Sequence, residues 1–396
     1  MIKFEMESFY TTHKYLVERT HSPVRRLLMD EIDWSQRLIG IKGSRGVGKT
    51  TFLLQYAKEY YGFDRQCLYV NFNNFYFTEH SLLEFAEQFY NNGGRVLLID
   101  QTFKYENWSK ELRACHDRFK DLKIVFSAST VMRLIEDNQD IKDVVVAYNL
   151  RGFSLREYIN LKTGLNLPPL SLEDIINNHT QLALEITKQT NPLDCFEAYL
   201  HHGFYPFFLE QRNFTENLIK TMNMMLEVDI LIIKQIEPKY LSKIRKLLYL
   251  ILRTAPDVPN VSQLSKAIET SRATVMNYIK CLRDARLLNT LYAVGDEYPK
   301  KPKQIFVHNT NLMNAINAEF VNRVAESRTF FYNALLARHT VNICKYQTDF
   351  CIDKHYFFRI DNTTTNRTNN KVFFVESDTL IGNERNIPLW IFGFLY

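Results

Sequence analysis

One glycine-rich segment constrains the fold of this chain more than any other feature. Residues 43–50 read GSRGVGKT, the complete G-x-x-x-x-G-K-T pattern, and they lie between the apolar run 37–42 and a helical pattern. In such a strand–loop–helix setting, Gly43, Gly46 and Gly48 let the backbone curl so that its N–H groups face phosphates. The segment predicts a nucleoside triphosphate site. A chance glycine-rich turn, the alternative, would not explain both flanks.

The side chains of this loop have separate expected roles. Lys49 is placed to reach the β- and γ-phosphates, and the hydroxyl of Thr50 is placed to bind Mg²⁺. The predicted nucleotide contacts are Gly43, Ser44, Arg45, Gly46, Val47, Gly48, Lys49, Thr50 and Thr51. A nucleoside triphosphate with Mg²⁺ is therefore the expected ligand.

Strand and helix patterns alternate through residues 1–150. The predicted strands are 37–42, 67–72, 96–100, 123–127 and 144–150, and the predicted helices between them are 50–60, 81–90 and 106–120. Continuous apolar strands separated by helices indicate a parallel sheet that is covered on both faces. The expected fold class is α/β.

The third of these strands ends in a pair of polar residues. Asp100 closes the apolar strand VLLID, where an aspartate can hold Mg²⁺ through water, although it could instead cap a helix. Gln101 follows, and an amide can orient a water but accepts a proton much less well than a carboxylate does. This pair predicts slow hydrolysis, or nucleotide holding without turnover.

Other polar residues follow the fourth and fifth strands. Ser129 and Thr130 end the segment SAST and are candidates to lie beside the γ-phosphate, or alternatively to cap the next helix. Arg151 and Arg156 come after the fifth strand, where an arginine can neutralise transition-state charge or simply lie at the surface. Lys49, Gln101 and Ser129 form the predicted catalytic set.

A helix–turn–helix pattern spans residues 259–288. Its first helix is predicted at 261–269, and Ser271 is placed to cap a second helix over 272–285, which could enter a major groove. The possible DNA contacts are Arg272, Asn277 and Lys280 on that helix and Lys300 and Lys301 in the following YPKKPK segment. The alternative is a protein-contact module that binds no nucleic acid.

Composition restricts the classes of protein to which this chain can belong. The net charge of +5 is mild and does not by itself indicate a polyanionic partner. The sequence contains no run of 18 apolar residues that could span a membrane, so a cytoplasmic protein is expected. Six scattered cysteines lack metal-ligand spacing and suggest reduced thiols. Residues 361–370 read as a polar loop, whereas the very apolar segment 387–396 is expected to dock in a core.

The order of these motifs resembles a known family. The matching segments of the first half are GSRGVGKTT (43–51), CLYVNF (67–72), VLLIDQ (96–101), NWSKELRACHDRF (107–119), KIVFSAST (123–130) and LRGFSLREY (150–158). Those of the second half are GFYPFFLEQ (203–211), TSRATVMNYIKCLRDARLL (270–288), KPKQIFVHNTNL (301–312), ESRTFFYNAL (326–335) and TDFCID (348–353). Together they resemble the prokaryotic AAA-type P-loop ATPases that carry a C-terminal domain of unknown function.

The resemblance implies an architecture. It implies a P-loop core with strand order 5-1-4-3-2, followed by a helical lid, a winged helix and a small α+β restriction-endonuclease-like domain. The corresponding ranges here are 1–153, 154–237, 238–316 and 317–396. It also implies ATP rather than GTP, which agrees with the lack of an Asn-Lys-x-Asp segment, and it leaves the protein partner and the oligomeric state open.

The chain departs from the family pattern at three places. It has Asp100-Gln101 where Asp-Glu is usual and Ala128-Ser129-Thr130 where Gly-Ser-Ser is usual. The stretch 358–362 reads FRIDN where relatives show a Phe-Glu-x-Gly-Gly-Lys-type segment. The missing Glu and Lys oppose nuclease activity. The residues that could be remnants of a metal site are Glu326, Asp349, Asp353, Lys354 and Lys371.

Three functions are consistent with these observations. The leading one is an ATP-binding AAA-type protein that hydrolyses slowly or acts as a nucleotide-gated switch, in which the nucleotide orders the lid and positions the winged helix. The second is a DNA-binding regulator with ATP as a regulatory ligand. The third, a metal-dependent nuclease, is the least favoured.

Overall fold

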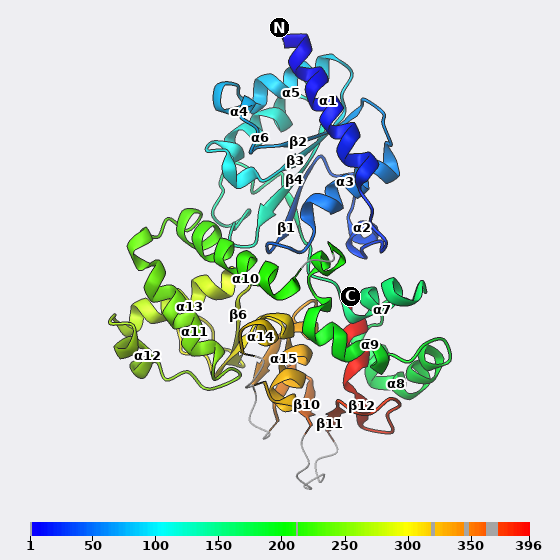
Figure 1. Ribbon diagram of the computed structural model, residues 1–396, viewed down its shortest axis with the longest axis vertical. Coiled ribbons are helices and arrows are strands. Elements are labelled where there is room, and N and C mark those ends of the chain that lie inside the picture. The colour runs from blue at the N-terminus through cyan, green and yellow to red at the C-terminus, as the bar shows by residue number, and fades with distance from the viewer. Residues whose placement is uncertain (1, 211–212, 318–320, 344–347, 362–370) are drawn as a thin grey trace. The chain divides into compact units, whose positions relative to one another are not determined.

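The computed structural model describes residues 2–210, 213–317, 321–343, 348–361 and 371–396. The chain forms two compact units, Met1–Arg151 and Gly152–Tyr396, and each contains its own sheet (Figure 1). The predicted parts 154–237, 238–316 and 317–396 all lie within the second unit. No helix in the described part of the chain combines the length and apolarity that a membrane crossing requires.

The first unit is built on a five-stranded parallel sheet. Its strands are β1 Leu38–Gly43, β2 Cys67–Asn71, β3 Val96–Asp100, β4 Lys123–Ser129 and β5 Val146–Asn149. They lie in the order β2-β3-β4-β1-β5, and every neighbouring pair is parallel. This is the order 5-1-4-3-2 read from the other edge, so the expected P-loop fold is confirmed.

Helices cover both faces of this sheet because its central strands are apolar on both sides. The helices are α1 Ile2–Arg19, α2 Leu28–Glu31, α3 Lys49–Tyr60, α4 Tyr76–Glu79, α5 Leu82–Asn91 and α6 Trp108–Arg118, with the 3-10 turn η1 at Thr102–Lys104. Figure 1 shows α1 and α3 on one face and α5 and α6 on the other. All of β3 is buried, as a strand covered on both faces requires.

Helix α1 packs beside β2, the strand at one edge of the sheet. An edge strand leaves backbone groups without partners in the ladder, and here a side chain supplies one. The Nδ1 atom of His13, which is 3% exposed, accepts a hydrogen bond from the backbone N–H of Tyr69 at 3.0 Å. Burial lowers the pKa of His13 to about 4, so this imidazole is neutral in the folded protein.

His13 gives the first unit a pH-dependent stability. A histidine in the unfolded chain has a pKa of about 6.5 and protonates first as the pH falls. The stabilising contribution of the neutral imidazole is therefore complete above about pH 6.5 and declines towards pH 4, by at most roughly 3 kcal/mol. In His13→Asn, the amide Oδ1 can replace Nδ1 as the acceptor for the Tyr69 N–H. Urea unfolding at several pH values should show the loss of stability between pH 6.5 and pH 4 in the natural protein but not in His13→Asn. Identical pH profiles would contradict the assignment.

The second unit begins with helices. Their bounds are α7 Leu155–Thr163, α8 Leu172–Thr187, α9 Leu193–Ala198, α10 Phe214–Met224, α11 Leu241–Leu252, α12 Val261–Ala267, α13 Arg272–Asp284, α14 Thr310–Asn317 and α15 Arg323–Leu335. Short 3-10 or π segments lie at η2 Tyr199–Gly203, η3 Pro206–Glu210, η4 Met225–Ile232, η5 Pro238–Tyr240 and η7 Leu389–Phe394. Ser271 caps α13 by accepting from the Thr274 N–H at 3.0 Å, as the sequence predicts.

A mixed sheet of seven strands completes this unit. The strands are β6 Leu288–Ala293, β7 Gln304–Val307, β8 Val341–Ile343, β9 Phe350–Ile352, β10 Tyr356–Ile360, β11 Val372–Glu376 and β12 Asn386–Pro388. Their order is β12-β11-β10-β9-β8-β6-β7. The antiparallel hairpin of β6 and β7 follows α12 and α13, and β6 also pairs in parallel with β8. One sheet thus joins the helix–turn–helix segment to the C-terminal strands.

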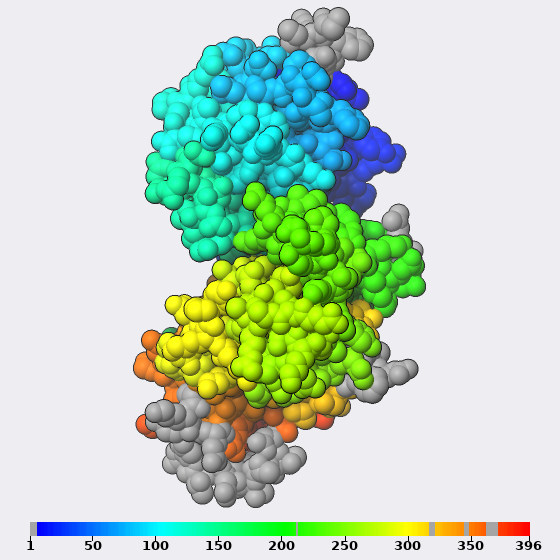
Figure 2. All heavy atoms as spheres, turned by 90° about the vertical axis from the view of Figure 1, so that its left-hand side faces the viewer, coloured from blue at the N-terminus to red at the C-terminus, as the bar shows by residue number. Residues whose placement is uncertain are grey.

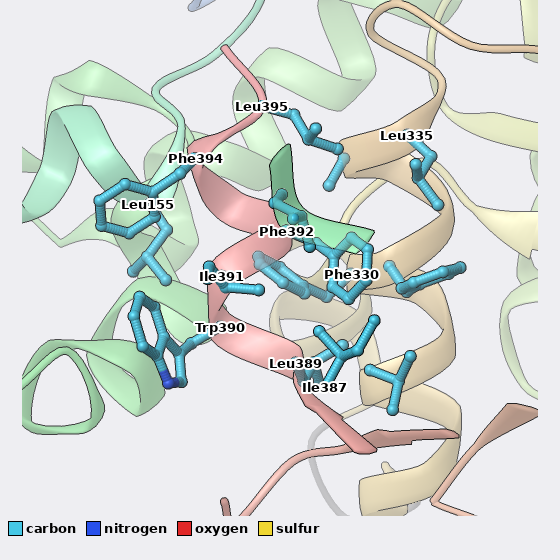
Figure 3. Packing of buried hydrophobic residues seen from close by; sticks show 14 of the residues in the cluster. Leu155, Phe330, Leu335, Ile387, Leu389, Trp390, Ile391, Phe392, Phe394 and Leu395 are labelled. Carbon is cyan, nitrogen blue, oxygen red and sulfur yellow. The ribbon is translucent and has the colours of Figure 1, made fainter. Parts of the chain in front are cut away.

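The apolar C-terminal segment packs in the core of the second unit. Residues 387–392, which include Trp390, are fully buried or nearly so, and η7 contacts α7, α8 and α15. Figure 3 shows η7 lying between Leu155 of α7 and Phe330 of α15, with side chains directed towards both. The prediction that this segment docks in a core is confirmed. The predicted loop 361–370 lies outside the described residues apart from Asp361.

Cysteines are reduced thiols in the described residues. Cys67, Cys115, Cys281 and Cys351 are buried, and Cys195 is partly exposed. Burial raises the pKa of the Cys115 thiol to about 12, so that thiol stays protonated. Cys344 lies outside the described residues.

Candidate functional site

The glycine-rich loop connects β1 to α3. Gly46 and Gly48 adopt φ angles of 81° and 93°, in the left-handed region that glycine enters without steric cost. A Cβ atom on Gly43 would lie 2.8 Å from the carbonyl oxygen of Leu150 and 2.9 Å from Val47 Cγ2, so only glycine fits there. Gly48 is the N-cap of α3, whose first N–H groups are left for a ligand. This loop and helix end form a cradle that suits a phosphate chain.

Lys49 is the first residue of α3 and folds over the loop. Its Nζ donates to the carbonyl oxygens of Gly43 at 2.7 Å and Ser44 at 2.9 Å. Ser44 and Val47 are buried, whereas Thr51 is exposed on α3. The ammonium group therefore lies over the space that the loop encloses, where a phosphate would provide stronger acceptors than the two carbonyls.

Thr50 and Asp100 meet although they are distant in sequence. The hydroxyl Oγ1 of Thr50 donates to Oδ2 of Asp100 at 2.7 Å. A hydroxyl and a carboxylate at the N-terminus of the loop helix are the oxygen donors that Mg²⁺ prefers in this setting. The donor set fits the predicted cation, and the two residues predicted to hold it lie together.

Three further groups surround the Asp100 carboxylate. The Tyr69 hydroxyl donates to Oδ2 at 2.8 Å, the Gln101 N–H donates to Oδ1 at 2.9 Å, and the Ser127 hydroxyl also donates to Oδ1. Burial and the nearby Asp100 charge raise the pKa of Tyr69, so its phenol remains a hydrogen-bond donor. Sequence reasoning passed over Tyr69 and Ser127. The available signal was the predicted strand order, which places the strands that carry them on either side of β3.

Gln101 has a strained backbone. Its φ of 58° is left-handed, which costs a side chain with a Cβ of order 1 kcal/mol. Its N–H is shared between Asp100 Oδ1 and Ser127 Oγ, which lies at 2.9 Å, and it precedes η1. These two bonds hold the turn that carries Gln101 directly after Asp100.

Two other predicted positions lie around the loop. Ser129 ends β4 and pairs in register with Gly43, which places it beside the loop. The alternative in which Ser129 or Thr130 caps a helix is wrong, because residues 130–145 contain turns but no helix. The guanidinium of Arg45 lies 5.1 Å from the ring centroid of Phe103 in η1, which follows Gln101.

An arginine that sequence reasoning missed braces the loop. Arg26 is buried, and its guanidinium donates to the carbonyl oxygens of Val47 at 3.2 Å and Arg151 at 2.6 Å. Nothing local in the sequence distinguishes Arg26 from its neighbour Arg25.

The expectation that Arg156 could neutralise transition-state charge fails. Its side chain is buried in the second unit and donates to the carbonyl oxygens of Tyr396 and Leu167.

The predicted DNA contacts differ in their surroundings. Arg272 and Asn277 are exposed on α13, and Lys301 is exposed between β6 and β7. Lys280 instead lies 4.8 Å from the Tyr298 ring centroid, and Lys300 pairs with Asp296 at 2.6 Å. Figure 2 shows the segment from α11 to β7, coloured lime to yellow, at the surface of the second unit.

The possible remnants of a nuclease site do not come together. Glu326 accepts from Asn314 at 2.8 Å, Asp349 accepts from the Ile360 N–H at 2.9 Å, and Asp353 binds Thr340 and His339. Lys354 lies with Asp353 in the tight turn between β9 and β10, Lys371 precedes β11, and Asn362 lies outside the described residues. Among described residues, no group of three or more His, Cys, Asp or Glu side chains could hold a metal ion.

Comparison with known proteins agrees with this geometry. Residues 35–159 match a family model described as an AAA domain, and residues 193–318 match one described as a domain of unknown function (DUF8612). The first match agrees with the sheet order and the loop of the first unit: this part of the chain has a P-loop fold and is similar to an AAA domain. Neither match extends over half of the chain.

One relative and two solved structures are also similar to this chain. The chain is 25% identical over 288 residues to the uncharacterized protein MJ1637 of Methanocaldococcus jannaschii, a match that covers 68% of this chain and 60% of that protein's length. The replication initiator DnaA bound to AMPPCP and single-stranded DNA is 18% identical, over 69% of this chain and 92% of that one, with a TM-score of 0.28. The Aeropyrum pernix ORC1 protein in complex with DNA is 11% identical, over 79% and 92%, with a TM-score of 0.29. At these TM-scores neither structure bears on the function of this chain.

Proposed function

We propose that this protein binds ATP with Mg²⁺ at residues 43–51, hydrolyses it slowly and acts as a nucleotide-gated switch. The observation that carries the proposal is the 2.7 Å contact between Thr50 Oγ1 and Asp100 Oδ2 at the N-terminus of the loop helix. It unites the loop and the strand-end carboxylate in the arrangement that Mg²⁺ and a phosphate chain need. The AAA domain match over residues 35–159 supports the same class of ligand.

Each loop residue has a part in the proposed reaction. The loop amides would bind the phosphates, Lys49 would move from the Gly43 and Ser44 carbonyls to the phosphate oxygens, and Thr50 with Asp100 would hold the cation. Bound Mg²⁺ would neutralise charge on the β- and γ-phosphate oxygens. Water attacks the γ-phosphorus as the bond to ADP breaks, and the proton passes to solvent.

Gln101 accounts for the slow rate in this proposal. Its amide can orient the attacking water but cannot take a proton from it, which a carboxylate at this position could. A switch requires that ATP stays bound for longer than ordinary turnover allows. Residues 152–396 are then the part of the chain on which the nucleotide acts.

The hydroxyl of Thr50 provides the test. We expect Thr50→Val, which keeps the shape and loses the hydroxyl, to weaken Mg²⁺-dependent ATP binding about tenfold or more, because a charge-assisted contact is lost. Binding measured in EDTA should hardly change, and Thr50→Ser should behave as the natural protein. Equal affinities of Thr50→Val and the natural protein in Mg²⁺ would refute the proposed site.

A second candidate function is DNA binding by α13 and the β6–β7 hairpin. Its support is the capped helix with exposed Arg272 and Asn277 and the exposed Lys301. If these groups contact phosphates, Lys300→Glu with Lys301→Glu should reduce DNA affinity and flatten its dependence on salt. The same changes at exposed Lys220 and Lys239 serve as the charge-matched control. DNA affinity that is absent, or unaffected by the first pair, would leave a protein-contact module.

A further inference from the structure

The Asp100 carboxylate is saturated by donors from the protein itself. A carboxylate offers about four acceptor positions. Here Oδ1 accepts from Ser127 Oγ and the Gln101 N–H, and Oδ2 accepts from Thr50 Oγ1 and Tyr69 Oη. Asp100 is 2% exposed, so water does not replace a missing donor easily. A hydrated cation that approaches Asp100 must therefore displace one of these four donors.

Three of the four donors are poorly suited to leave. The Gln101 N–H belongs to the backbone of a strained turn and also bonds Ser127 Oγ. Ser127 is 1% exposed, and its Oγ both donates to Asp100 and accepts from that N–H, so moving Oγ away by a change of χ1 would break both bonds. The Thr50 hydroxyl is itself an expected ligand of the cation.

The Tyr69 hydroxyl is the donor that can leave at least cost. A phenol O–H turns about its C–O bond without moving the ring, which is held on the buried strand β2. The side chains of Asn71 and Thr50 lie close enough to this hydroxyl to lower its pKa, against the larger rise that burial causes, so it has polar neighbours other than Asp100.

We infer that the Tyr69 hydroxyl competes with Mg²⁺ for Asp100 and so sets the Mg²⁺ concentration at which the loop binds ATP tightly. Tyr69 is a positioning residue in this account, because it acts through Asp100 and does not contact the nucleotide. The inference rests on the proposed function. It makes Mg²⁺ loading of the site weaker than a carboxylate with a free acceptor position would allow.

Tyr69→Phe removes the competing hydroxyl and keeps the ring. The measurement is the affinity for a fluorescent, non-hydrolysable ATP analogue as a function of Mg²⁺ concentration. We expect the Mg²⁺ midpoint of Tyr69→Phe to fall about three- to tenfold, with nucleotide affinity in EDTA unchanged. The matched control is Tyr56→Phe, which removes another buried phenol hydroxyl of the same unit, on α3, where the ring stacks on Trp34.

The outcomes separate this inference from the proposal beneath it. A lower midpoint in Tyr69→Phe alone supports the competition. An unchanged or raised midpoint overturns it, since Tyr69 would then be a spectator or would help to hold the cation, while ATP binding by the natural protein would still stand. No binding of the analogue by the natural protein, with or without Mg²⁺, would overturn both.

Discussion

Phe392→Ala should destabilise the second unit by about 3–5 kcal/mol, the usual cost of deleting a fully buried phenyl ring. Phe392 is fully buried in η7, and its ring centroid lies 4.7 Å from that of Phe331 and 5.7 Å from that of Phe358. The deletion would leave a cavity between η7, α15 and β10. Since native proteins are stable by only about 5–15 kcal/mol, this single change should remove a large part of the stability of the unit.

A tryptophan next to Phe392 makes the effect measurable. Of the three tryptophans only Trp390 lies in the second unit, where it is fully buried and donates from Nε1 to the Leu380 carbonyl at 3.1 Å. Urea unfolding followed by Trp390 fluorescence, with Trp34 and Trp108 replaced by Phe, reports this unit. The control is Tyr249→Ala, at a ring of the same unit that is 53% exposed. A Phe392→Ala midpoint equal to that of the control would show that η7 is not part of the core.

Gln101→Glu should raise the rate of ATP hydrolysis by about tenfold or more. The substitution is nearly isosteric, so it leaves the φ of 58° and the backbone bonds to Asp100 and Ser127 in place. It adds a carboxylate that can accept a proton from the attacking water, and general-base catalysis typically contributes about 10²–10⁴-fold. The expected gain is smaller because the site did not evolve around a glutamate.

Steady-state hydrolysis with saturating Mg²⁺ and ATP tests this prediction. Gln101→Ala separates orientation of the water from proton transfer, and it should hydrolyse more slowly than the natural protein if the amide orients that water. A natural protein that turns over ATP at ordinary rates, with Gln101→Glu no faster, would mean that another group activates the water. Slow turnover would then not explain a switch.

The first unit was largely predictable from the sequence because its signals are local or follow from chain order. The run VLLID is long enough and apolar enough to give β3 at its observed bounds, Val96–Asp100. The loop pattern locates the turn into α3, and the resemblance supplies the strand order, which brings Thr50 to Asp100. In the second unit, Ser271 was likewise recognisable as the cap of α13.

The groups that complete the site were less accessible because they depend on register and on long-range contacts. Tyr69 and Ser127 reach Asp100 only through the alignment of β2 and β4 on either side of β3. Arg26 braces the loop across a turn that carries no periodic pattern. The parallel pairing of β6 with β8 joins strands that are far apart in sequence, and neither strand indicates its partner.

Calorimetric titration of the natural protein and of Lys49→Ala with ATP and Mg²⁺ tests the central claim most directly. We expect the natural protein to bind one ATP and Lys49→Ala to bind at least about thirtyfold more weakly, because a charge-assisted contact to the phosphates is lost. Lys220→Ala, at an exposed lysine of the second unit, should bind as the natural protein does. Equal affinities of the natural protein and Lys49→Ala, or no binding by either, would contradict the account.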